Sequence, residues 1–190
     1  MSEAQRATVQ YPGGLAARYR WGGSGSAEEV FALSEARGAL VDHVELAGGD
    51  PQRMCRAELR IEGPTGEWTA RFASPVFDEP AGLLWDTEAT LIVKYGFRAY
   101  GLASRGGELR WTHLSGTPIV AVLGSPRLAH VIVQSEVETV ALDGAGGVRW
   151  RVAHSDVIAA VELLAGTLTL TTYGGGIAAL DPVTGQSLSR

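Results

Sequence analysis

The sequence predicts an all-β protein built from repeated four-stranded antiparallel sheets, and three observations point to this class. From residue 81 onward, short apolar or alternating runs are separated by turn residues. Four such runs make one unit, and the units recur with a period of about 40 residues. The 190 residues, 45% hydrophobic and 19% charged, suit one domain that can bury a core. Units of this length suit the blades of a small β-propeller-like array.

The regular units span residues 81–114, 118–154 and 157–190. The first contains the runs AGLLWD, TLIVKYG, RAYGLAS and ELRWTHL, and the second contains PIVAVLG, HVIVQS, ETVALDG and VRWRVAH. The third contains VIAAVELLA, TLTLTTY, GIAALDP and QSLSR. Because every run is short and bounded by turn residues, each is expected to be one strand.

Residues 7–75 are predicted to form a degenerate first unit, which brings the array to about four. The run RATVQY pairs with AARYRW around Pro-Gly-Gly, CRAELRIEG pairs with EWTARFA around Pro-Thr-Gly, and ALVDHVEL is a further strand. A helix over 27–37 is inserted, with Ser26 and Glu29 as a capping box and Gly38 at its end.

The weak final run QSLSR leaves an edge that RATVQY is expected to cover by pairing into the last sheet. That pairing would close the ring within one chain. The alternatives are an open stack of blades, a ring closed by dimerisation, and a different β fold.

A turn motif marks the third and fourth runs of each regular unit. The third unit has Ala179, Asp181, Thr184 and Gly185, with Ser189 at the last motif position. The second unit has Ala141, Asp143, Gly147 and Trp150. The first unit has Gly107 and Trp111, with Gly101 and Ala103 at the positions of the motif's Ala and Asp. In the second unit Trp150 comes one residue early. These residues resemble the β-propeller repeat of the pyrroloquinoline-quinone enzymes, Ala-x-Asp-x-x-Thr-Gly-x-x-x-Trp, over a little more than half the chain.

The chemistry of the motif indicates a structural role. Asp143 and Asp181 can accept backbone N–H groups in a tight turn, and glycine supplies the positive φ. The tryptophans Trp111 and Trp150 can bury a large area between blades. The quinone-binding members of the family are longer, with eight blades and acidic residues around a calcium ion. The sequence has no matching constellation, and we expect no cofactor.

The sequence contains no motif typical of a catalytic centre, and no catalytic residue is assigned. His113 and His154 follow the blade tryptophans at +2 and +4. With Asp156 they form one candidate metal site, and the simpler interpretation is that they are exposed loop residues.

Partner recognition is predicted on the loops at one end of the blades. The connections from fourth to first strand (74–80, 113–118, 153–157) and from second to third strand (94–98, 134–138, 172–176) emerge together. The candidate contact residues are Phe77, Asp78, Glu79, Tyr95, Phe97, Arg98, Glu136, Glu138 and Tyr173. Aromatic and charged side chains on loops over a rigid scaffold suit protein recognition.

The net charge of −5 argues against a nucleic-acid or anionic-membrane partner, because both require a positive field. A single cysteine, Cys55, forms no intrachain disulfide, and no apolar leader or membrane-length run is present. These features predict a cytoplasmic, bacterial-type protein.

The leading hypothesis is a non-catalytic protein-interaction module, for example an inhibitor or immunity-type protein. The alternatives are an enzyme or a small-ligand or metal binder with its site at the blade loops, and a homo-oligomer that completes a ring.

Overall fold

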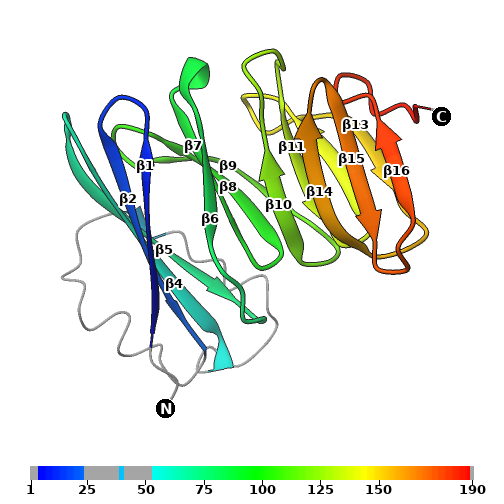
Figure 1. The fold of residues 1–190 in the computed structure, drawn as a ribbon. Helices are drawn as coiled ribbons and strands as arrows, with labels where there is room; N and C mark the ends of the chain where they lie inside the picture. The colour runs from blue at the N-terminus through cyan, green and yellow to red at the C-terminus, as the bar shows by residue number, and fades with distance from the viewer. Residues whose placement is uncertain (1–3, 24–38, 41–52, 189–190) are drawn as a thin grey trace.

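The computed structural model describes residues 4–23, 39–40 (backbone only) and 53–188. In it the chain forms an all-β array of four antiparallel sheets stacked side by side in an open arc (Figure 1). The predicted fold class is therefore confirmed. The helix expected over 27–37, and His43 with most of ALVDHVEL, lie outside the described residues. Among the described residues, no helix has the length and apolar character that a membrane crossing requires.

The four sheets follow one another along the chain. Sheet 1 contains β1 (Gln5–Tyr11), β2 (Leu15–Gly22), β4 (Cys55–Gly63), β5 (Gly66–Ser74) and the short β3 (Ala39–Leu40), which runs parallel to β5. Sheet 2 contains β6 (Ala81–Trp85), β7 (Thr90–Tyr95), β8 (Arg98–Ala103) and β9 (Leu109–Leu114), with the 3₁₀-helix η4 (Asp86–Glu88) after β6. Sheet 3 contains β10 (Ile119–Leu123), β11 (Val131–Ser135), β12 (Glu138–Leu142) and β13 (Val148–Ala153). Sheet 4 contains β14 (Ile158–Leu164), β15 (Thr167–Thr172) and β16 (Ile177–Leu180).

The predicted ring closure is wrong, because the N-terminal strand does not pair with the last sheet. β1 pairs with β2 from Gln5↔Trp21 to Tyr11↔Leu15 and lies in sheet 1, far from sheet 4 (Figure 1). The turn contains Gly13 and Gly14, both with positive φ, as a tight hairpin requires. A local hairpin costs far less loop-closure entropy than pairing across the whole chain. Of the alternatives, the open stack is therefore the one that the single chain adopts.

Three apolar clusters fill the spaces between neighbouring sheets. Tyr19, Leu59 and Phe72 of sheet 1 pack with Tyr100 of sheet 2, and the rings of Phe72 and Tyr100 lie 5.0 Å apart. Similar clusters join sheets 2 and 3 and sheets 3 and 4. The alternation of buried and exposed residues along β4 follows from the two-residue repeat of a strand, which turns every second side chain into the cluster.

A tryptophan–glycine contact links each sheet to the next. Trp68, Trp111 and Trp150 each occupy the third position of the last strand in their hairpins, and each indole packs directly on a turn glycine of the following sheet: Gly107, Gly146 and Gly185. These glycines have φ of 77°, 81° and 73°. They recur every 39 residues (146 − 107 and 185 − 146), which explains the period seen in the sequence.

The turn motif forms the aspartate hydrogen bonds predicted for it, but in the second unit the positive-φ glycine lies at a different position. Asp143 Oδ1 accepts N–H bonds from Ala145 and Gly147 at 3.0 and 2.8 Å, and Asp181 Oδ1 accepts one from Val183 at 2.7 Å. Thr184 Oγ1 accepts the N–H of Gln186 at 3.3 Å. The left-handed residue of the second motif is Gly146, one position before the glycine chosen from the sequence, because this turn is one residue shorter.

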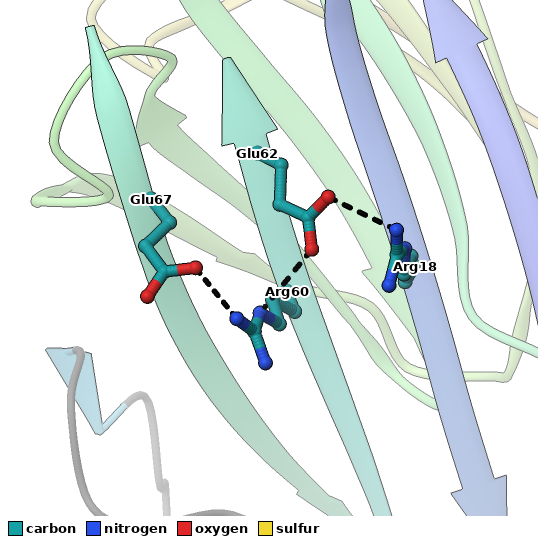
Figure 2. Close-up of polar contacts among 4 residues, drawn as sticks. All are labelled: Arg18, Arg60, Glu62 and Glu67. Atoms are coloured by element: carbon teal, nitrogen blue, oxygen red, sulfur yellow. Dashed lines mark hydrogen bonds and ion pairs between the residues drawn. The ribbon is translucent and has the colours of Figure 1, made fainter.

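Near the β1–β2 and β4–β5 turns, the outer face of sheet 1 carries exposed charged side chains. Figure 2 shows Arg18 paired with Glu62 at 3.0 Å, and Arg60 between Glu62 at 3.5 Å and Glu67 at 2.6 Å. These groups are largely exposed, so each pair contributes little stability. They keep this part of the face hydrated, whereas the side chains of Glu58 and Arg71 on the same face are only 13% and 19% exposed.

Candidate functional site

The predicted recognition loops lie together at one end of the sheets. We call this end the loop face and define it as residues 74–80, 94–98, 113–118, 134–138, 153–157 and 172–176. Strand β2 ends and strand β4 begins at this same end of sheet 1. The loop face thus brings together residues from all four sheets.

Backbone hydrogen bonds connect these loops into a continuous band. Ser115 N–H donates to Phe97 O and Ile119 N–H donates to Gly96 O, both at 2.8 Å. The same pair of bonds recurs in the next repeat, where His154 N–H donates to Val137 O at 2.8 Å and Ile158 N–H to Glu136 O at 2.6 Å.

Two further bonds extend the band across sheets 2, 3 and 4. Glu136 N–H reaches Pro118 O at 3.1 Å, and Tyr173 N–H reaches Val157 O at 2.7 Å. Loops bonded to one another in this way hold their side chains in fixed relative positions, which lowers the entropic cost of binding.

An ion pair holds the first loop of the band. Asp78 accepts a 2.8 Å bond from Lys94 Nζ and a 2.7 Å bond from the N–H of Gly96. The side chains of Lys94, the only lysine of the chain, and Asp78 are 9% and 19% exposed. Within the chain, the Asp78 carboxylate positions the loop through Lys94 and Gly96, and its contact with a partner stays a prediction.

The other predicted contact residues, apart from Tyr95, form an exposed group and a half-buried group. Phe77 and Tyr173 are 52% and 84% exposed, and Glu79 is also exposed. Four are half-buried: Phe97, Arg98, Glu136 and Glu138. Of these, Arg98 Nη1 donates to Thr112 Oγ1 at 3.2 Å, and Glu138 lies 3.2 Å from Arg151 Nε.

Tyr95 is buried, and its prediction as a surface residue is wrong. It is 1% exposed in the core between sheets 1 and 2, with its ring 6.3 Å from that of Phe72. It follows Leu91 and Val93 on the inward face of β7, so the strand alternation, continued by two residues, identifies it as core.

Three exposed apolar residues of the loop face were not predicted. Leu114, Val137 and Val157 are 53%, 36% and 39% exposed. Each lies at a strand end or in the connection beyond it, where an apolar residue has no sheet to face, and this position was the signal available in the sequence.

The candidate metal site is not formed. Among the described residues, no group of three or more His, Cys, Asp or Glu side chains could hold a metal ion. His113 lies within β9, whereas His154 lies beyond the end of β13. The +2 and +4 offsets from the tryptophans therefore place the two rings differently.

His154 is engaged in a polar network instead. Its Nε2 lies 2.6 Å from Thr139 Oγ1, and that hydroxyl donates to Gln134 Oε1 at 2.6 Å. His154 Nε2 is therefore the donor to Thr139. The third candidate, Asp156, is exposed, and its Oδ1 accepts the N–H of Val157 at 2.7 Å.

Because His113 and His154 are partly buried, we expect the stability of the fold to decrease in acid. Burial lowers the pKa of His113 and of His154 below the ordinary value of 6.5. The unfolded chain then binds more protons than the native chain as the pH falls through 6.5, so the free energy of unfolding should decrease from pH 7.5 to 5.5. Urea denaturation at several pH values tests this. The His113→Gln/His154→Gln variant should show a shallower pH dependence, and an unchanged slope would refute the assignment.

Comparison with known proteins supports the fold. No protein-family model matches the chain, and no curated protein matches it in sequence. Among solved structures, BamB from Moraxella catarrhalis matches over 99% of this chain and 66% of its own, with a TM-score of 0.57 and 14% identity. HIRA residues 644–1017 match over 98% of this chain and 52% of theirs, with a TM-score of 0.52 and 12% identity. The Pan2 WD40 domain of Neurospora crassa matches over 72% and 45%, with a TM-score of 0.50 and 15% identity.

These neighbours are β-propeller and WD40-type structures, and they define the class to which this fold belongs. The chain spans at most about two-thirds of each. At such low identity the likeness concerns the fold alone. The chain is thus an open, four-sheet array of the β-propeller type.

Proposed function

We propose that the chain is a non-catalytic protein-interaction module whose loop face binds a protein partner. The observation that carries the proposal is the hydrogen-bonded band of loops, which displays exposed Phe77, Val137, Val157 and Tyr173. Aromatic side chains held in fixed positions are typical hot spots of protein binding, and the two valines add apolar area around them. The turn signature at 179–185 supports a pyrroloquinoline-quinone-type repeat used here as a scaffold.

The charges of the loop face favour a partner with a basic surface. Glu79 and Asp156 are exposed and Glu136 is half-buried, whereas Lys94 is neutralised by Asp78 and Arg98 is bonded to Thr112. An acidic, apolar surface of this kind would block a basic-surfaced target, as an inhibitor or immunity-type protein does. Complementary charge would also speed association, and salt would slow it.

Site-specific photo-crosslinking tests the proposal. A benzophenone amino acid is placed at position 173 or 77, and at position 148 as the control, because Val148 is 49% exposed but lies at the opposite end of its sheet. Irradiation in the native host should give the same protein adduct from 173 and 77 and none from 148. Equal adducts from all three positions, or none from the loop face, would contradict the proposal.

Once the partner is captured, the Tyr173→Ala variant should bind it at least tenfold more weakly, because an exposed aromatic side chain on a rigid surface is a typical hot spot. The free energy of unfolding should change by less than about 0.5 kcal/mol, since Tyr173 is 84% exposed. Val148→Ala should change neither quantity. Isothermal titration calorimetry and urea denaturation measure the two effects, and unchanged affinity in Tyr173→Ala would rule the residue out.

A further inference from the structure

A groove of about 510 Å³ lies between sheets 3 and 4, at the end of the strands opposite the loop face. It is bordered by the β10–β11 connection, the β14–β15 turn and the turn after β16, which gather at the top of Figure 1. Its lining includes Ser125, Pro126, Arg127, Leu128, Leu163 and Val183. The volume is within the range of sites that bind small ligands or short peptide segments.

The groove lies beside a connection that is longer than its counterparts in sheets 2 and 4. The β10–β11 connection covers 124–130, whereas those of sheets 2 and 4 cover only 86–89 and 165–166. At the junction of sheets 2 and 3, the Glu88 carboxylate lies directly on Gly144, where an added Cβ would come within 2.7 Å of it. No carboxylate occupies the corresponding place between sheets 3 and 4, where Pro182 and Val183 line the open space.

The base of the groove is fixed. His130 is buried, its Nε2 donates to Pro182 O at 2.7 Å, and its ring meets that of Trp150 edge-on at 5.9 Å. Ser125 accepts the N–H of Arg127 at 3.3 Å and the N–H of Leu128 at 3.0 Å, which sets the turn that carries Arg127. A groove with a rigid base retains its shape before a ligand arrives.

The walls are apolar and partly exposed. Leu163 and Leu128 form the deeper part, and Val183 is 59% exposed. Ala165 has a φ of 50°, in a turn position that usually takes Asn, Asp or Gly. An Asn or Asp would adopt this positive φ with less strain but would place a polar group at the groove. Alanine therefore keeps this wall apolar.

Arg127 is the one charged residue among those lining the groove. It is exposed, and no hydrogen bond or ion pair joins its guanidinium to the residues that the structure describes. No Asp or Glu lines the groove to neutralise it. An arginine beside apolar walls matches a carboxylate carried by an apolar body, because guanidinium and carboxylate can form two parallel hydrogen bonds.

We propose that this groove binds the C-terminus of an apolar peptide segment, with the terminal carboxylate on Arg127 and the last side chains against Leu128, Leu163 and Val183. A peptide suits the site better than a free fatty acid, because the groove is open and is bordered by the main chain of three turns. A terminal carboxylate leaves the apolar walls free for the side chains that precede it. The site is independent of the loop face.

The test is an NMR titration of the full chain with N-acetyl-alanyl-valyl-leucine, its C-terminal amide, and octanoate. The free-acid peptide should shift the amide resonances of Ser125, Leu128, Gly166 and Val183 in a saturable way. The amidated peptide should bind about threefold to fivefold more weakly, since it lacks the charged partner for the exposed Arg127. Octanoate should bind more weakly than the free-acid peptide.

Arg127→Gln should abolish the preference for the free acid, and Arg149→Gln, an exposed arginine of β13 outside the groove, should preserve it. Equal affinity for acid and amide, tighter binding of octanoate, or an unaffected Arg127→Gln variant would overturn the proposal. So would the absence of saturable shifts at the groove. None of these outcomes affects crosslinking at the loop face, so the two proposals fail separately.

Discussion

Replacing Gly146 with alanine is expected to lower the free energy of unfolding by about 3 kcal/mol. Two effects add. The residue has a φ of 81°, a conformation that costs an alanine about 1 kcal/mol, and the new methyl group would come within 2.8 Å of Trp111 Cβ and Cγ. Urea denaturation monitored by tryptophan fluorescence measures the loss.

Gly175 provides the matched control for this substitution. Its φ is 82°, but nothing lies within 4 Å of the position that a Cβ would take. Gly175→Ala should therefore cost only about 1 kcal/mol, from the backbone term alone. If both variants lose the same amount, the tryptophan–glycine contact does not hold neighbouring sheets together.

Removal of the Asp78 carboxylate by Asp78→Ala is expected to cost about 3 kcal/mol, because it leaves the ammonium of Lys94 buried without its partner and the N–H of Gly96 without an acceptor. The double variant Asp78→Leu/Lys94→Met removes both charges and should recover much of that loss. Thermal and urea denaturation of the variants provide the measurement.

The exposed pair of Arg18 and Glu62 serves as the comparison for this second prediction. These side chains are 59% and 34% exposed, so Glu62→Gln should cost well under 1 kcal/mol. A loss in Asp78→Ala as small as that in Glu62→Gln would show that the buried pair does not anchor the first loop.

Much of the fold could be predicted because it depends on local residue patterns. Alternating residues located the strands of sheets 2 to 4, and the glycine and aspartate turns located their hairpins. The hairpin of β1 with β2 around Pro-Gly-Gly was predicted in the same way and is present, whereas the further pairing of this strand with the last sheet is absent. The local hairpin forms because its short loop closes at a lower entropic cost than a pairing between the two ends of the chain.

The candidate site could be predicted only in part. The topology of a four-stranded unit places the loops at one end, so Phe77 and Tyr173 were expected there, and both side chains are exposed. The bonds that connect the loops join backbone groups, for example Ile158 N–H and Glu136 O, and these carry no residue preference. Likewise, a sequence does not show that Asp78 meets Lys94 across 16 residues. The groove is lined by residues of three separate turns, which come together only once sheets 3 and 4 are stacked.

Native-state hydrogen exchange tests most directly whether the loop face is a rigid platform. The amides of Ser115, Ile119, Glu136, His154, Ile158 and Tyr173 each donate to a neighbouring loop. We expect these amides to exchange as slowly as those of the buried strands β7 and β11, with opening free energies close to that of global unfolding. Exchange at the rate of an unstructured peptide would contradict this expectation, because the loops would then move independently and could not hold Val137, Val157 and Tyr173 in place for a partner.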